Sequence, residues 1–182
     1  GVPLGAAVLS VAAGVASFTI TVPTTLDTID ELDETYNLSV GGIAAVGTIT
    51  DDDAAPTITA VSSPTVAEGT DLVYAVTLSN ASATPSSFAF TLGGGTAVPA
   101  DYGTPTFSNG VTLAGGVLSV PAGVTSFTVS VPSTLDTIDE GAAETYNLSV
   151  GGVAALGTIT DDDAAPTISS VSSPTVAEGS DL

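Results

Sequence analysis

The stretch TITDDDAAPTI, residues 48–58, decides how this chain is organised, and it recurs unchanged at residues 158–168. In each copy three aspartates follow a short run of Thr and Ile and precede an Ala-Ala-Pro segment. β-Branched residues favour a strand, whereas proline ends one. We therefore interpret each triplet as the end of one module, directly before the linker to the next.

Longer matches surround the triplets. Residues 17–22 (SFTITV) match residues 126–131 (SFTVSV) at an offset of 109. Residues 34–40 and 144–150 are both ETYNLSV, at an offset of 110. One residue has therefore been inserted in the second copy, after Glu140. Self-similarity at a fixed period is the signature of a tandem array.

The repeat predicts three parts. Residues 1–53 are the C-terminal half of one β-sandwich repeat, residues 54–163 are a complete repeat, and residues 164–182 are the N-terminal start of the next. An incomplete β-module would leave strand edges unpaired. We therefore expect the two ends of the sequence to be cuts in a longer array.

Apolar residues alternate with small or polar ones, which predicts half-buried strands. Leu72, Tyr74, Val76 and Leu78 show this period of two. The same alternation runs through residues 88–92, 127–131 and 146–150. Turns are predicted at residues 80–82, 93–95, 121–123 and 151–152. About seven strands in about 100 residues fit an all-β fold, an immunoglobulin-like antiparallel β-sandwich repeated in tandem.

Charge restricts the partners. The chain has 20 Asp and Glu residues and no Lys, Arg or His, giving a net charge of −20. Because nothing here can neutralise phosphate, we expect no nucleic-acid partner and no binding to anionic membranes. The most apolar run, residues 5–16, is too short to insert directly into a membrane.

Residue types also restrict the chemistry. Without Cys there is no disulfide and no thiolate metal site. Without His, Cys or Lys there is little to act as a base or nucleophile near neutral pH, so we expect no enzymatic activity. A pair of carboxylates could cleave glycosides, but the chain has no Trp on which a sugar would stack.

The acids gather at strand ends and loops. If these loops meet at one end of the sandwich, like charges about 4 Å apart repel by about 1 kcal/mol in water and more near a protein surface. A Ca²⁺ ion, which takes six to eight oxygen ligands, removes this repulsion. Zn²⁺ and Cu²⁺ would favour His or Cys. The alternative is that the acids spread over the surface and only keep the protein soluble.

Several segments resemble the motifs of Calx-β modules, and within a module they follow the order of that family. They are PTVAEG at 64–69, GTA at 95–97 with ADY at 100–102, the acidic loop DTIDELDETY at 27–36, and GTITDDD at 157–163. The chain also resembles the calcium-binding tandem repeats of large bacterial surface adhesins of the RTX type. Both resemblances imply a Ca²⁺ site where each module ends.

This resemblance implies the following metal ligands. In the complete repeat they are Glu68, Asp101, Asp136, Glu140, Asp161, Asp162 and Asp163, with Asp139 beside them in the acidic loop. In the partial repeat they are Asp27, Glu31, Asp51, Asp52 and Asp53. Glu34 and Glu144 each open a strand, and for them a ligand role and an exposed strand-end position stay equally open.

The leading hypothesis is a structural extender repeat of a large secreted or cell-surface bacterial protein, such as an adhesin or biofilm matrix protein. Calcium at the module junctions would stiffen the array, and the partners would be neighbouring modules of the same chain. One alternative is a self-assembling extracellular filament or surface-layer subunit, in which identical chains pair. Another is a carbohydrate- or ice-binding module.

Overall fold

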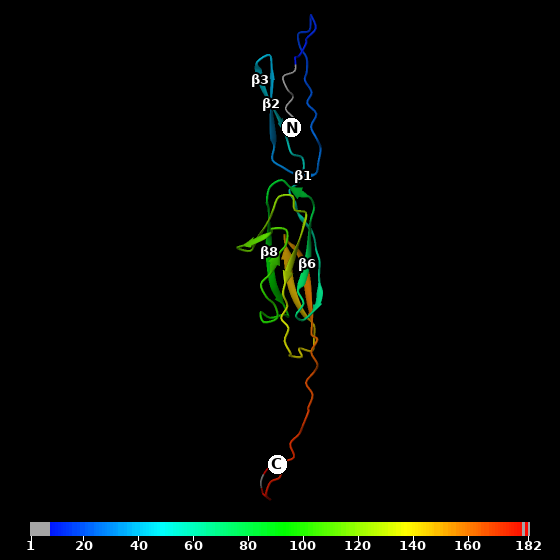
Figure 1. The fold of residues 1–182 in the computed structure, drawn as a ribbon, viewed down its shortest axis with the longest axis vertical. Helices are drawn as coiled ribbons and strands as arrows, with labels where there is room; N and C mark the ends of the chain where they lie inside the picture. Colours follow the sequence, from blue (N-terminus) through cyan, green and yellow to red (C-terminus); the bar gives the residue numbers. More distant parts are fainter. Residues whose placement is uncertain (1–7, 180, 182) are drawn as a thin grey trace.

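The computed structural model describes residues 8–179 and 181, and every regular element in those residues is a β-strand (Figure 1). The molecule is elongated, with the β2–β3 hairpin near one end, a sandwich in the middle and an extended C-terminal segment at the other end. Within the described residues no helix is long and apolar enough to cross a bilayer. The expected all-β fold is confirmed.

The sandwich consists of two sheets. One has six strands in the order β10-β11-β8-β13-β14-β5, and the other has four in the order β4-β6-β12-β9. Neighbours are antiparallel, except that β5 runs parallel to β14. The bounds are β4 Ile58–Val61, β5 Thr65–Ala67, β6 Leu72–Leu78, β8 Ser86–Gly95, β9 Thr106–Phe107, β10 Thr112–Ala114, β11 Val117–Val120, β12 Ser126–Val131, β13 Glu144–Val150 and β14 Val153–Thr160.

The core lies between the sheets and follows the predicted alternation. In β6 every second residue is buried, with Tyr74 and Val76 fully enclosed. From the opposite sheet, Tyr146, Leu148 and Val150 are equally buried. Burying such apolar side chains contributes about 1.5–3 kcal/mol each. The period-2 pattern in the sequence therefore identified the core correctly.

Two predicted turns are not turns. Residues 93–95 belong to β8, where three glycines with positive φ continue the strand through a register shift against β13. A side chain at Gly95 would overlap the carbonyl oxygen of Thr145, so this bulge requires glycine. Residues 80–82 include a short strand, β7 (Ala81–Ser82), which pairs outside the sandwich. The strands of the two sheets exceed the expected seven because β5, β9 and β10 are short extra edge pieces.

Apart from the two-residue strand β1 (Ile29–Asp30), which pairs with β7, the partial repeat forms strands only where its pairing is local. Its strands β2 (Glu34–Val40) and β3 (Ile43–Ile49) form a hairpin with the same register as β13 and β14. By contrast, residues 17–22 are not a strand, although they match β12. In the complete repeat β12 pairs with β6, and the counterpart of β6 would lie before residue 1. Phe18 is therefore 50% exposed, whereas its counterpart Phe127 is 2% exposed.

The parallel edge pair brings two distant segments together. β5 and β14 end at the same edge because they run in the same direction. The Glu68 amide, directly after β5, donates to the Thr160 carbonyl oxygen at 3.2 Å. The Thr160 hydroxyl in turn donates to the carbonyl oxygen of Val66 at 3.1 Å. Glu68 is thereby fixed beside the aspartates that follow β14.

The packing of Tyr74 requires a glycine at position 157, and this requirement can be tested. The Tyr74 hydroxyl donates to the Tyr146 carbonyl oxygen at 3.4 Å and lies where a Cβ on Gly157 would be. We predict that Gly157→Ala lowers the free energy of unfolding by about 1–3 kcal/mol, because the added methyl displaces the buried ring. Urea unfolding measures this change. In the control Gly103→Ala, the new methyl would lie 3.5 Å from Pro132, which is an ordinary contact. Equal stability of the two variants would contradict the packing described.

Candidate metal centre

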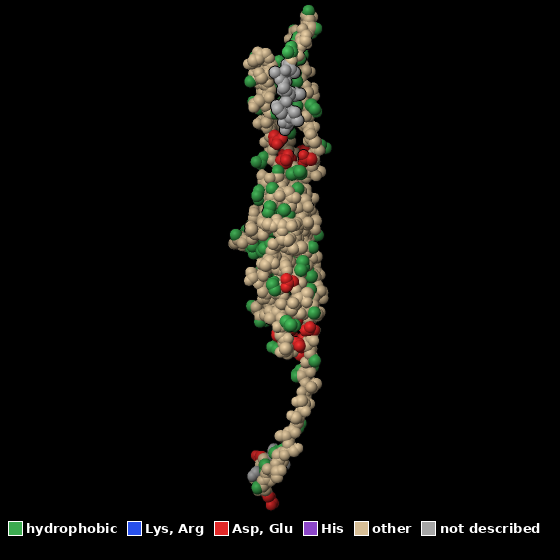
Figure 2. Space-filling model, viewed as in Figure 1, with side chains coloured by type: hydrophobic (Ala, Val, Ile, Leu, Met, Phe, Trp, Pro, Cys, Tyr) green, Lys and Arg blue, Asp and Glu red, His purple; other side chains and the backbone are tan. Residues whose placement is uncertain are grey.

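Five carboxylates converge at the end of the sandwich, and we call them the carboxylate cluster: Glu68, Asp136, Glu140, Asp161 and Asp163. They come from the ends of β5 and β14 and from the loop between β12 and β13. They form two groups that share Glu68, one with Asp136 and Asp163 and the other with Glu140 and Asp161. Within each group the oxygens that could bind a metal lie within 4.8 Å of one another. Figure 2 shows acidic side chains gathered at this end and again at the joint above the sandwich.

Glu68 is the centre of the cluster and is only 8% exposed. Its Oε2 atom and the Oδ2 atom of Asp163 are buried and have no hydrogen-bond partner among the described residues. A buried carboxylate oxygen without a partner is costly, because it has left water and gained nothing. Both orphaned oxygens belong to one group of candidate ligands.

Backbone amides hold the other aspartates in place. Asp161 accepts hydrogen bonds from the amides of Asp163, at 3.0 Å, and Gly141, at 3.2 Å. Asp136 accepts one from the Ile138 amide at 2.8 Å. The amide of Asp163, with those of Gly141 and Glu140, lowers the pKa of Asp161 below its ordinary value. The cluster therefore combines at least one firmly ionised carboxylate with others under strong repulsion.

The pKa of Glu68 is raised to about 7. The first cause is a hydrogen bond with the carboxyl group of Glu140, which requires a proton on one of the two. Burial and the negative charges of Asp136 and Asp161 add to it. Burial likewise raises the pKa of Asp163, together with the charge of its neighbour Asp162. Without a cation the cluster retains protons that isolated carboxyl groups would lose.

Glu144 extends the cluster, although the sequence left its role open. Burial and a hydrogen bond with Asp101 raise its pKa to about 7. It opens β13 opposite Ile159, close to the end of β14, and this register places it near Asp161. Asp101 also accepts a hydrogen bond from the amide of Val98. The antiparallel pairing of residues 144–150 with the strand before the aspartates was the signal that could have identified it.

The remaining predicted ligands of the complete repeat lie differently. Asp162 is exposed and belongs to neither group, because successive residues of an extended segment point to opposite sides. Asp139 reaches the carboxylate of Asp161 but is in neither group. The predicted set therefore divides into an inner part around Glu68 and an outer part formed by Asp101, Asp139 and Asp162.

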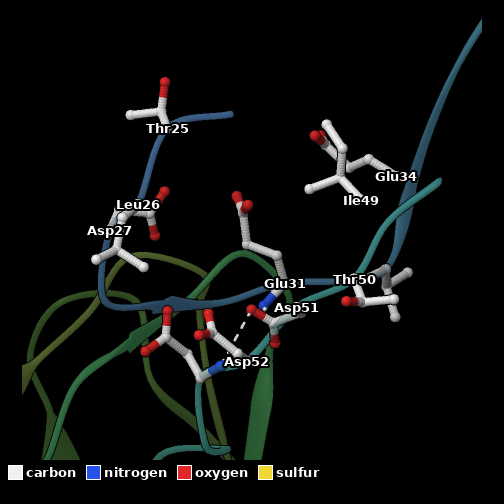
Figure 3. Close-up of a pocket in the computed structure, with 11 residues that line it drawn as sticks. Thr25, Leu26, Asp27, Glu31, Glu34, Ile49, Thr50, Asp51 and Asp52 are labelled. Atoms are coloured by element: carbon white, nitrogen blue, oxygen red, sulfur yellow. Dashed lines mark hydrogen bonds between the residues drawn. The ribbon is translucent and has the colours of Figure 1, made fainter. Parts of the chain in front are cut away.

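The partial repeat builds the same scaffold. Asp51, the counterpart of Asp161, accepts hydrogen bonds from the amides of Asp53, at 3.4 Å, and Glu31, at 3.1 Å. Asp27 accepts one from the Ile29 amide at 2.9 Å, as Asp136 does from Ile138. Asp27, Glu31 and the triplet line one open pocket (Figure 3). Asp52 is exposed like Asp162, and no counterpart of Glu68 exists in this partial copy.

Sequence reasoning missed one residue here. Asp33 accepts a hydrogen bond from the Asp51 amide at 3.1 Å, so it positions the triplet. The complete repeat has Ala143 at this place, after the inserted residue. The difference between the two copies of the loop was the available signal.

The donor set fits a hard cation. Every candidate ligand is a carboxylate oxygen, which suits Ca²⁺ or Mg²⁺ and not the softer metals. Ca²⁺ accepts irregular arrangements of six or more oxygens, whereas Mg²⁺ requires near-ideal octahedra with several waters. The orphaned oxygens of Glu68 and Asp163 are the atoms that an ion would satisfy.

No family model and no curated protein matches this chain. Among solved structures it is similar to CBD12 from CALX1.2, with 17% identity and a TM-score of 0.44 over 59% of this chain and 45% of that one. It is similar to the apo-form Calx CBD1 domain at the same identity and TM-score, over 59% and 96%. A third is the Ig-like domain (615–713) of human Obscurin-like protein 1, with 14% identity and a TM-score of 0.33 over 65% and 98%. The chain thus spans about half the length of the first of these structures, and the likeness concerns the fold alone.

The raised pKa values predict how stability depends on pH in a chelator. Glu68 and Glu144 titrate near 7 in the folded chain and near 4.5 when exposed, so the folded state binds more protons between these values. Stability therefore falls as pH rises from about 4.5 to 7. The lowered pKa of Asp161 acts in the opposite direction, but only below about 3.8.

Thermal unfolding followed by circular dichroism in chelator, at several pH values, measures this dependence. We predict a higher Tm at pH 5.5 than at pH 7.5, and a smaller difference in the variant Glu68→Gln. A Tm that rises with pH over this window would contradict the description of the cluster.

Proposed function

We propose that this chain is part of a tandem array of β-sandwich modules whose ends bind Ca²⁺, and that the array is a structural extender of a large secreted or cell-surface bacterial protein. The observation that carries the proposal is the buried Glu68, with an unpartnered oxygen, at the centre of two groups of carboxylates. A structure that buries an acid without a cationic partner has a reason to bind a cation from outside.

Electrostatics supports this reason. The chain contains no cationic side chain, so an internal ion pair cannot neutralise any of its 20 acids. At an effective dielectric constant of about 20, two like charges 4 Å apart repel by about 4 kcal/mol. Protonation relieves this repulsion only at the lower end of the physiological pH range. A divalent cation relieves it at every pH at which the carboxylates are ionised.

The residues that would hold the ions follow from the two groups. Asp136 and Asp163 with Glu68 would hold one, and Glu140 and Asp161 with Glu68 would hold another. Bound there, Ca²⁺ would supply charge neutralisation and a cross-link between loops far apart in sequence. The loop between β12 and β13, the end of β5 and the end of β14 would then become one rigid unit.

The position of the cluster supports an extender role. It lies at the end of the sandwich, directly before the Ala-Ala-Pro segment that leads to the next repeat. The partial repeat has its acids at the equivalent place, at its joint with the sandwich. Repeat arrays gain their properties from contacts between neighbours, so stiffness at each joint sets the stiffness of the whole.

The proposed extracellular location follows from the Ca²⁺ affinity expected of such a site. Extracellular calcium modules work at affinities of about 10⁻⁴–10⁻³ M, which open, partly exposed carboxylate sites can reach. A chain without Lys or Arg also offers no cleavage site to trypsin-like proteases. Both properties suit a protein exposed outside the cell, with structure rather than catalysis as its role.

Calorimetric titration with Ca²⁺ tests the proposal. We predict that Glu68→Gln weakens binding by about tenfold or more, because it removes the carboxylate shared by both groups. The matched control is Asp71→Asn, which removes the same charge from an exposed residue that accepts a hydrogen bond from Ser130 at 2.9 Å. Equal affinities of the two variants, or no binding by the unmodified chain, would overturn the proposed calcium site.

A further inference from the structure

The joint between the partial repeat and the sandwich contains a direct protein contact in addition to the acids. Strand β1 (Ile29–Asp30), from the acidic loop of the partial repeat, pairs in parallel with β7 of the sandwich. Ile29 lies opposite Ala81 and Asp30 opposite Ser82. One module thus forms a separate two-stranded parallel sheet with a short segment of the next.

Asp30 and Ser82 form the polar centre of this contact. The Ser82 hydroxyl lies 2.7 Å from Oδ2 of Asp30 and 3.2 Å from its carbonyl oxygen, and it can donate to either. The Ala83 amide donates to the same carbonyl oxygen at 2.8 Å. Ser82 is only 4% exposed, and its hydroxyl oxygen also accepts a hydrogen bond from the Thr84 amide at 3.2 Å, which orients it toward Asp30. A second link lies close by, where the Asn80 side chain donates to the Ala54 carbonyl oxygen in the linker at 2.8 Å.

Comparison of the two copies of the acidic loop shows that this contact and the candidate metal site use different residues. Asp30 has its counterpart in Asp139, and both lie in the identical segment LDTIDE. Neither residue belongs to the groups that could hold a metal. Residues 1–182 include no counterpart of Ser82 that Asp139 could contact, because at the offset of the repeat it would lie beyond residue 182. Ile138 is accordingly 63% exposed, whereas Ile29, held in the joint, is 37% exposed.

We propose that Asp30 and Ser82 form a latch that fixes the orientation of one module on the next, with Ile138 and Asp139 presenting the same latch to β7 of a following copy. The latch rests on the proposed role as a tandem array, but it needs no bound ion. It assigns to the fifth residue of LDTIDE a function different from that of the acidic residues beside it. Asp27 and Glu31 line the acidic pocket of this loop, whereas Asp30 contacts the next module.

Pulsed electron paramagnetic resonance can measure the orientation of the joint. The chain has no native Cys, so labels on Val46→Cys and Val117→Cys are unique. Both sites are exposed, one on the hairpin and one on the sandwich. We expect a single narrow distance distribution in the labelled parent chain. Asp30→Ala and Ser82→Ala should each broaden it, and the double variant should broaden it no further, because both remove one contact.

Two control variants make the test specific. Asp139→Ala, which changes the counterpart of Asp30 in the complete repeat and does not touch the contact with β7, should leave the distribution narrow. Ser87→Ala, at an exposed serine of β8, should also leave it narrow. A narrow distribution in Ser82→Ala, or equal broadening by Asp30→Ala and Asp139→Ala, would overturn the latch.

Calcium titration of the same variants separates the latch from the proposed calcium site. Ser82→Ala should bind Ca²⁺ as the parent chain does while its joint loosens. Glu68→Gln should lose Ca²⁺ affinity while its joint stays narrow. If the parent chain binds no Ca²⁺ and Ser82→Ala still broadens the distribution, the latch stands without the calcium site.

Discussion

The absence of any cationic side chain is the constraint on which this structure depends. In most proteins a buried carboxylate is paired with Lys or Arg, or it accepts several hydrogen bonds. Here only the second solution is available, and Asp161 uses it by accepting from two backbone amides. Glu68 does not, since one of its oxygens is buried and has no partner within the part of the chain that the structure describes. The acidic end of the module therefore retains protons or needs a cation from outside.

The parallel pairing of β5 with β14 turns this constraint into a site. The two strands end at one edge, which places Glu68 beside aspartates more than 90 residues later in the sequence. The loop between β12 and β13 then supplies Asp136 and Glu140 from a third direction. The cluster thus joins the beginning, the middle and the end of the module. An ion bound there would tie together segments that are more than 90 residues apart in the sequence.

The sequence predicted the features that depend on local pattern. Alternation gave the buried face of β6 and β13, and the repeat gave two acidic loops with the same backbone hydrogen bonds. Features that depend on tertiary pairing were not accessible in this way. Residues 17–22 have the pattern of β12 and yet form no strand, because a strand needs its neighbour. Residues 93–95 look like a turn, but the pairing of β8 with β13 makes them a bulge.

The residues of the candidate site divide in the same way, into those that the sequence pattern identified and those that depend on tertiary pairing. The order of the motifs indicated Glu68 and the aspartates after β14. It could not distinguish Asp161 and Asp163, which point into the cluster, from the exposed Asp162, because this difference depends on how the extended segment is oriented. It also left Glu144 open, because only the pairing of β13 with β14 places this residue at the acidic end of the module. Asp30 was indistinguishable from its acidic neighbours until the joint with β7 was seen.

The most direct test of the central claim compares Ca²⁺ with simple screening. Thermal unfolding of the chain would be followed at pH 7.5 in chelator, in 2 mM free CaCl₂, and in NaCl at the same ionic strength as the CaCl₂. All three samples would contain about 0.1 M background salt, where the screening length is already about 10 Å and a few millimolar more hardly changes it, so the added NaCl should leave the Tm near its value in chelator. We expect a higher Tm in CaCl₂ alone, because an ion that binds only the folded state stabilises it by mass action. Equal Tm values in the two salts would show that the acidic ends need no bound ion, and would contradict the account.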